Sequence, residues 1–197
     1  HAAYEVFVGG TVINLDIILT YLPVSILYIL SMAMGYVGLR YIELSISSPI
    51  CNSSGALVAV LAILFDGIAG YSPLALFAVA LVCVGAVGLG VVEAREDDEL
   101  RIERQKASNY KYTKSFMALA MPAAYCVLDA AGTFADSRVL EIISRTVEDY
   151  EASANVAYEL TFLAAGIGCL VYLLARREKF TFKAELPKYV GAACETV

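Results

Sequence analysis

The sequence predicts an all-α fold, a polytopic bundle of transmembrane helices. Of the 197 residues, 59% are hydrophobic and only 17% are charged, whereas soluble domains are about half apolar and about a quarter charged. The mean hydropathy is +0.69. A soluble fold of this length has too much surface to hide so many apolar side chains. The composition therefore indicates an integral membrane protein.

Five complete membrane spans are predicted, because each needs about 20 mostly apolar residues. The first three stretches carry no charge, and the last two carry one acidic residue each, Asp129 and Glu159. The spans cover residues 17–39, 44–65, 67–92, about 115–135 and about 154–175. A sixth span is expected to begin near Pro187 and to be cut off by the end of the chain. Since the chain also starts at His1, we expect it to be an internal fragment of a longer protein.

The connections between the spans differ in length and charge. We expect a tight hairpin at residues 40–43, and a turn at 66–73 with Pro73 in the first turn of the next helix. Residues 136–153 place apolar side chains on one helical face, which suits either a short interfacial helix or a polar loop with some apolar content. These side chains are Val139, Ile143, Val147 and Tyr150.

A charged linker divides the chain into two halves. Residues 93–114 contain six acidic and six basic residues, which is typical of a solvated, partly helical segment. The predicted domains are thus residues 1–92 with three spans, the linker 93–114, and residues 115–197 with two spans and a truncated third. Leu22-Pro23 and Leu186-Pro187 open spans in the two halves and weakly suggest an internal repeat.

The orientation is predicted from Lys and Arg in the short loops. The linker has six of them and residues 176–188 have five, whereas residues 136–153 have two. By the positive-inside rule, the two rich loops should both be cytoplasmic. Because the chain has no Trp, tyrosines near the span ends should form the interfacial belt. These are Tyr21, Tyr41, Tyr71, Tyr112, Tyr158, Tyr172 and Tyr189.

The stretch GYVGLRYIELSISSP at residues 35–49 resembles the junction between the third and fourth helices of drug/metabolite transporters of the EamA type. In that family an Ala-Leu-Arg-Tyr-like hairpin leads into a helix of small residues with a central proline. Here Gly38 stands where the Ala is usual. The resemblance implies helices three to eight of a ten-helix, two-repeat carrier of small metabolites in the cell inner (plasma) membrane. The family's usual topology places both basic loops outside, so the absolute orientation stays open.

Several polar residues within the spans are candidates for a substrate or ion pathway. A buried carboxylate is costly in a membrane unless it is paired, hydrated or protonated. Asp129 is therefore either a pathway residue or an interfacial carboxylate. Glu159, about one turn inside its span, poses a similar choice, whereas Glu195 lies about two turns past Pro187 and is expected to line a pathway. Ser48 and Asn52 flank Pro49, which frees a backbone carbonyl for a hydroxyl or a substrate. Packing by small residues is the alternative for that serine-rich helix. Tyr125 completes the candidate set.

Other chemistries have little support in the sequence. The net charge of −6 argues against a nucleic-acid partner. The glycines between Gly85 and Gly90 lie in a charge-free span, so helix packing explains them better than a nucleotide loop. His1 is the only histidine, so a His-based metal or hydrolytic site is unsupported. The isolated cysteines read as small buried thiols, namely Cys51, Cys83, Cys126, Cys169 and Cys194.

The leading functional prediction is a secondary transporter that moves a small metabolite by alternating access. The alternatives are an intramembrane enzyme that uses the Asp129 and Glu159 carboxylates, and a membrane scaffold that transports nothing. Polar residues scattered over several spans suit a pathway better than a clustered catalytic site, so an enzyme is not expected. The expected partners are the bilayer, the substrate and a coupling proton or cation. No cofactor is expected, and a homo-oligomer stays open.

Overall fold

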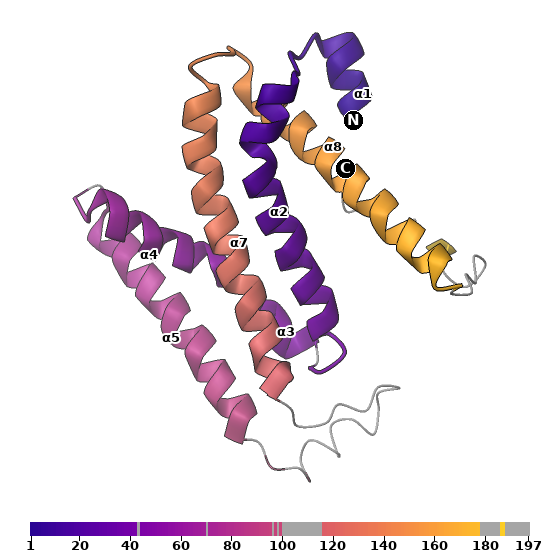
Figure 1. Cartoon of the computed structure of the whole chain (residues 1–197). Helices are drawn as coiled ribbons and strands as arrows, with labels where there is room; N and C mark the ends of the chain where they lie inside the picture. Colours follow the sequence, from indigo (N-terminus) through magenta and orange to yellow (C-terminus); the bar gives the residue numbers. More distant parts are fainter. Residues whose placement is uncertain are drawn as a thin grey trace. The chain divides into compact units, whose positions relative to one another are not determined.

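A computed structural model describes residues 1–42, 44–69, 71–95, 97, 99, 116–177 and 186–187. Every regular element within these residues is helical, so the all-α prediction is confirmed for this part of the chain. The elements, drawn in Figure 1, are α1 (Ala2–Tyr4), a π-helical turn η1 (Glu5–Gly9), α2 (Leu15–Gly38), α3 (Leu44–Cys51), α4 (Ser54–Asp66), α5 (Pro73–Arg95), α7 (Phe116–Ile143) and α8 (Tyr150–Ala175).

Five helical segments are long and apolar enough to cross a membrane. They are Leu15–Gly38, Ile46–Asp66, Pro73–Val92, Phe116–Ile143 and Tyr150–Ala175. The five predicted spans are therefore confirmed as apolar helices, with shifted bounds. Such helices are the elements of a membrane protein, because a helix satisfies its own backbone polar groups in hydrocarbon.

The described chain forms two compact units, His1–Phe162 and Leu163–Val197. The first unit contains all elements through α7 and the first half of α8. In the second unit α8 ends at a turn where Arg177 has φ 56°. There Arg176 Nη1 donates a hydrogen bond of 3.1 Å to the hydroxyl of Tyr172.

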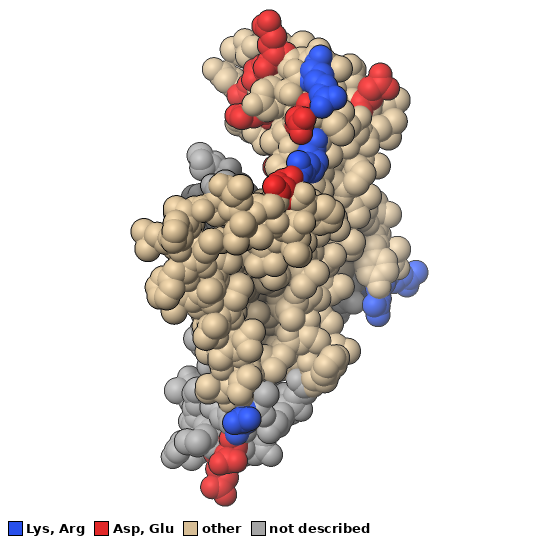
Figure 2. All heavy atoms as spheres, turned by 90° about the vertical axis from the view of Figure 1, so that its left-hand side faces the viewer, with Lys and Arg blue, Asp and Glu red and all other residues tan. Residues whose placement is uncertain are grey.

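The outer surface of α5 is apolar along its length. Leu74, Phe77, Leu81, Val84 and Val87 are all exposed. Figure 2 faces α4 and α5 and shows a broad surface without charged side chains, with charged groups above and below it. A face of this kind requires hydrocarbon or another helix against it.

Short polar segments define where two of the helices begin. The side chain of Asn14 caps α2, since its Oδ1 accepts a hydrogen bond of 2.8 Å from Ile17 N. Ser72 caps α5 in the same way, with Ala75 N donating to its Oγ at 3.2 Å. Pro73 is the first residue of α5, as predicted for residues 66–73.

The predicted span 44–65 is broken into α3 and α4. Pro49 lies inside α3, where it lacks the N–H that would bond one turn back. The break follows at residues 52–53, and Ser53 Oγ donates a hydrogen bond of 2.6 Å to Ile50 O. A serine hydroxyl that competes for a helix carbonyl in this way favours a bend.

Helix α7 is longer than the predicted span 115–135. It continues to Ile143, so residues 136–143 extend α7 instead of forming a separate short helix, and only residues 144–149 form a turn before α8. Val139 and Ile143 belong to α7, Val147 lies in the turn, and Tyr150 begins α8. Their shared apolar face instead packs against the core formed by α2, α7 and α8.

Helices α2 and α7 pack antiparallel through small residues. A Cβ atom on Gly38 would lie 3.1 Å from Cβ of Met121, and one on Gly132 would lie 3.3 Å from the ring of Tyr28. Later residues of α2 therefore contact earlier residues of α7. Glycine at these points lets the two backbones approach closely, as is common between membrane helices.

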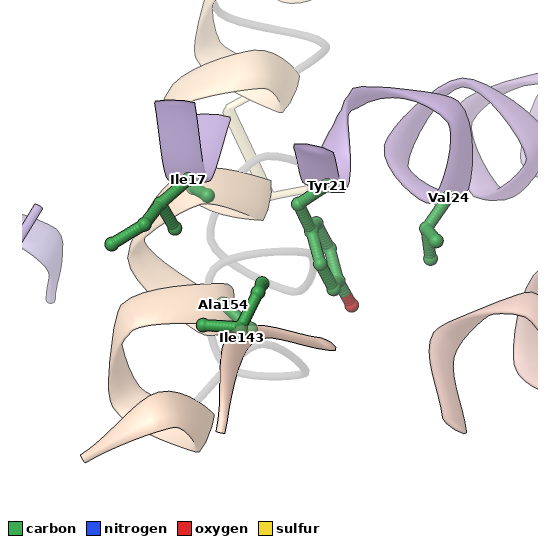
Figure 3. Close-up of a cluster of buried hydrophobic side chains, with 6 residues drawn as sticks. Ile17, Tyr21, Val24, Ile143 and Ala154 are labelled. Carbon is green, nitrogen blue, oxygen red and sulfur yellow. The ribbon is translucent and has the colours of Figure 1, made fainter. Parts of the chain in front are cut away.

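The main core cluster joins α2, α7 and the start of α8. Ile17, Tyr21 and Val24 of α2 belong to one buried cluster with Ile143 of α7 and Ala154 of α8, and Figure 3 labels these five residues. Only 5% of Tyr21 is exposed, so this side chain packs against other helices. Its ring is part of the helix interface.

Candidate functional site

Polar side chains line the interface between α2 and α7. We call this set the polar track: Tyr21 and Tyr28 of α2 with Tyr125, Asp129, Thr133 and Asp136 of α7. Two hydrogen bonds cross the interface. The hydroxyl of Tyr21 donates to Asp136 Oδ1 at 2.6 Å, and that of Tyr28 donates to Thr133 Oγ1 at 3.1 Å.

The helical repeat explains why these side chains of α7 meet α2. Residues three or four apart lie on the same face of a helix, and Tyr125, Asp129, Thr133 and Asp136 follow this spacing. On α2, Tyr21 and Tyr28 are seven residues apart, which is close to two turns. Polar groups thus face one another along much of the interface.

Asp129 occupies the middle of the polar track. It is half-buried and lies near the centre of the 28-residue helix α7, whereas the predicted span end at residue 135 placed it near a boundary. Its carboxylate interacts electrostatically with Tyr28, Tyr125 and Tyr158. Within the described part of the chain, Asp129 has no hydrogen bond and no ion pair.

An aromatic pair covers one side of the polar track. The rings of Tyr28 and Tyr158 of α8 meet edge to face, with centroids 5.9 Å apart at 75°. Tyr158 also contacts Phe162, with centroids 5.8 Å apart. Tyr158, which is predicted to be interfacial, therefore packs against Tyr28 of the polar track.

Glu159 lies outside the polar track. Its Oε1 is 2.8 Å from His1 Nδ1, and its Oε2 accepts a hydrogen bond of 2.6 Å from Ala2 N. The carboxylate is thus held by the N-terminal segment, although it follows Tyr158 directly. The structure brings Asp129 and Tyr125 together but does not bring Glu159 to them.

Ser48 and Asn52 form a separate local contact. Asn52 Nδ2 donates a hydrogen bond of 3.1 Å to Ser48 Oγ at the exposed end of α3. Their role in a substrate or ion pathway stays a prediction. Glu195 lies outside the described residues.

A pocket of about 300 Å³ is lined by residues of α7 that do not belong to the polar track. Its lining is mostly apolar and comes from α3, α4, α5 and α7. It includes Ile50, Leu57, Ala123, Ser53, Cys83 and Cys126. The hydroxyl of Ser53 lies 3.2 Å from Cys126 Sγ.

The cysteines differ in environment. Cys126 is buried, as predicted, Cys51 and Cys83 are partly exposed, and Cys169 is exposed, so the prediction of a buried thiol is wrong for Cys169. Cys194 lies outside the described residues. Among the residues that the structure covers, no group of three or more His, Cys, Asp or Glu side chains could hold a metal ion.

Sequence reasoning missed five side chains here, namely Tyr21, Tyr28, Thr133 and Asp136 of the polar track and the neighbouring Tyr158. Tyr21 and Tyr158 were assigned to the membrane interface, and Tyr28 and Thr133 carry no charge to attract notice. Asp136 carried a usable signal, because it lies seven residues after Asp129 and so falls on the same helical face. It lies one residue beyond the predicted end of the fourth span at residue 135.

Comparison with known proteins gives no further guide to the class of this helical membrane protein. No family model, no curated protein and no solved structure matches the chain.

Proposed function

We propose that this chain is part of a secondary transporter, which moves a small metabolite across the membrane by alternating access. The observation that carries the proposal is Asp129, a carboxylate in the middle of an apolar helix with no hydrogen bond or ion pair in the described part of the chain. An ionisable group at the centre of a span costs roughly 2.5–3.5 kcal/mol on insertion scales. A role in the transport pathway is a reason for the protein to keep the Asp129 carboxylate despite this cost.

The surroundings of Asp129 support this role. Transporters commonly place binding sites near the midplane, between helices that can move against one another. Asp129 lies on the face of α7 that also carries Tyr125, Thr133 and Asp136, and the α2–α7 interface at these residues combines glycine contacts with few hydrogen bonds. The tyrosines beside it offer hydroxyls and aromatic faces, which can bind a polar or cationic group.

The finer description remains part of the proposal. The resemblance of residues 35–49 to EamA-type transporters suggests a multi-pass protein of the cell inner membrane, with ten helices in two repeats. In this scheme the five spans described are the middle of the fold, and the linker 93–114 joins the repeats. The bilayer, a small metabolite and a proton or cation are the proposed partners.

Transport by the full-length protein tests the proposal. The protein is reconstituted into liposomes and given a panel of radiolabelled amino acids, nucleosides and sugars under an imposed proton gradient. At least one compound should accumulate, and Asp129→Asn should abolish its accumulation while exchange without a gradient can survive. Glu148→Gln, at an exposed residue of the turn after α7, is the matched control and should accumulate the compound normally.

Two results would contradict the proposal. If the parent protein accumulates and exchanges no compound of the panel, the scaffold or enzyme alternative is favoured. If Asp129→Asn transports like the parent across the pH range, transport stands but Asp129 is not its site.

A further inference from the structure

We infer that protons reach Asp129 along residues of the polar track together with Ser25 of α2. The route runs from Asp136 through Tyr21, Ser25, Tyr28 and Thr133. This inference rests on the proposed function and names the coupling ion and its route. It depends on hydrogen bonds and burial along the α2–α7 interface, taken in order from the end of α7 to its middle.

The route begins at Asp136. This residue is half-buried and lies two turns before the end of α7, on a segment that also carries the exposed Arg138 and Glu141. Its Oδ1 accepts the 2.6 Å hydrogen bond from Tyr21. The phenol hydrogen of Tyr21 points at Asp136 in this hydrogen bond, so it must turn toward Ser25 before the phenol oxygen can accept a proton from a protonated Asp136. Only the hydroxyl hydrogen has to move for this step.

Ser25 continues the route inside α2. It is 0% exposed, and its Oγ is a buried side-chain oxygen for which no hydrogen-bond partner is found. It lies four residues after Tyr21 and three before Tyr28, so one helical turn separates it from each phenol. A buried hydroxyl without a partner is an expected site for an internal water. A water there would connect the two tyrosines.

Tyr28 and Thr133 complete the route to Asp129. Tyr28 donates to Thr133 Oγ1 at 3.1 Å, which uses an acceptor position of the threonine. Within the described residues Thr133 donates no hydrogen bond, so its hydroxyl hydrogen can turn toward Asp129, one turn earlier on α7. Tyr28 also interacts electrostatically with both Asp129 and Asp136.

The proton balance of the transfer is simple. Asp136 loses one proton and Asp129 gains one. Each hydroxyl between them releases its own hydrogen as it accepts another, so none changes its net protonation. The other ionisable groups that interact with Asp129 are Tyr125 and Cys126 on α7, Tyr158 on α8 and Cys51 on α3.

The test uses the proton itself as the probe. Liposomes that contain the full-length protein are adsorbed on a solid-supported membrane, and a rapid acid step at constant sodium concentration is applied. Proton binding at Asp129 should give a transient current, which Asp129→Asn should abolish. Tyr21→Phe and Ser25→Ala remove single hydroxyls of the route, so each should slow the decay of the current several-fold.

Controls separate the route from general damage. Tyr36→Phe alters a tyrosine on the same helix that is 69% exposed, and its current should decay like the parent's. Each variant should elute as a single species from a size-exclusion column. Asp136→Asn should slow the decay as Tyr21→Phe does, so failure of one variant to fold leaves the other to decide.

Three results would overturn the inference. The first is a transient current that survives in Asp129→Asn. The second is a current that decays at the parent's rate in both Tyr21→Phe and Ser25→Ala. The third is a current that a sodium step at constant pH evokes and an acid step does not. The proposed function fails separately: a proton current without accumulation of any panel compound contradicts transport and leaves the route standing. Accumulation of a panel compound without a proton current supports transport and contradicts the proton route.

Discussion

Gly35 of α2 lies directly against the aromatic ring of Tyr125 on α7. A Cβ atom at Gly35 would be 2.8 Å from Cδ2 of Tyr125 and 3.2 Å from Cε2. These ring atoms are close to the tyrosine backbone and cannot move away as the end of a flexible side chain could. The absent side chain at Gly35 therefore positions Tyr125, which lies one helical turn before Asp129.

Gly35→Ala should destabilise the protein. The new methyl group forces the Tyr125 ring or the helix to shift, and overpacking of this kind costs about 1–3 kcal/mol. The better helix propensity of Ala offsets up to about 1 kcal/mol of this. Thermal unfolding in detergent measures the net effect. Gly88→Ala on α5, where nothing lies within 4 Å of the new Cβ, should show no loss, and equal stability of the two variants would contradict the contact.

Tyr21→Phe should lower stability by about 0.5–2 kcal/mol, since it removes the hydrogen bond to Asp136 but keeps the ring. A double-mutant cycle with Asp136→Asn isolates the pair, because the second substitution should cost less once the first is present. Unfolding by heat or denaturant provides the four free energies. Additive effects would mean that the two side chains do not interact. Tyr36→Phe, at an exposed position of α2, serves as the reference.

Reversing the charge of either member of the Arg138–Asp66 ion pair should lower the unfolding temperature. Arg138 Nη2 donates to Asp66 Oδ1, and the guanidinium also lies 5.0 Å from the centroid of Phe134. Arg138→Asp and Asp66→Arg each place like charges together, whereas the double variant restores opposite charges. Recovery of the unfolding temperature in the double variant would support the contact between the end of α4 and α7. A further loss would exclude it.

Cysteine labelling should place the two ends of α7 on opposite sides of the membrane. In the full-length protein, with its native cysteines replaced, one new cysteine is introduced at Ser144, in the exposed turn after α7. Another is introduced at Ser108, in the predicted linker and outside the described residues. The positive-inside rule predicts labelling of Ser108 from the cytoplasm and of Ser144 from outside. Labelling of both from one side would contradict the span, and the reverse labelling would favour the EamA-type orientation.

The membrane character and the approximate spans could be predicted because both depend on local composition. The bilayer is the solvent for these helices, and a stretch of about 20 apolar residues is stable in it whatever its neighbours are. Thus α2, α5 and α8 fall close to the predicted stretches. Pro73 could be placed at a helix start for the same reason, since its geometry depends only on its own ring.

The helix break and the extension of α7 needed the tertiary structure. Pro49 marked the region of the break, but its position at residues 52–53 goes with the contact of Ser53 with Cys126, 73 residues away in sequence. Residues 136–143 carry charges that suggested a loop. They continue α7 because Val139, Leu140 and Ile143 pack in the core with α2 and α8.

The sequence by itself determined the class of this protein and the number of apolar helices in the described part, and it singled out Asp129 as an acidic residue within an apolar span. Only the tertiary structure decided what surrounds that carboxylate. Tyr21 and Asp136 are 115 residues apart, and Tyr28 and Thr133 are 105 apart, so no local pattern joins them. Hydropathy measures the transfer of one segment into lipid, which is a property of that segment alone. The pairing of polar groups depends instead on which helices meet and in which register, and that is determined by close packing at Gly35, Gly38 and Gly132.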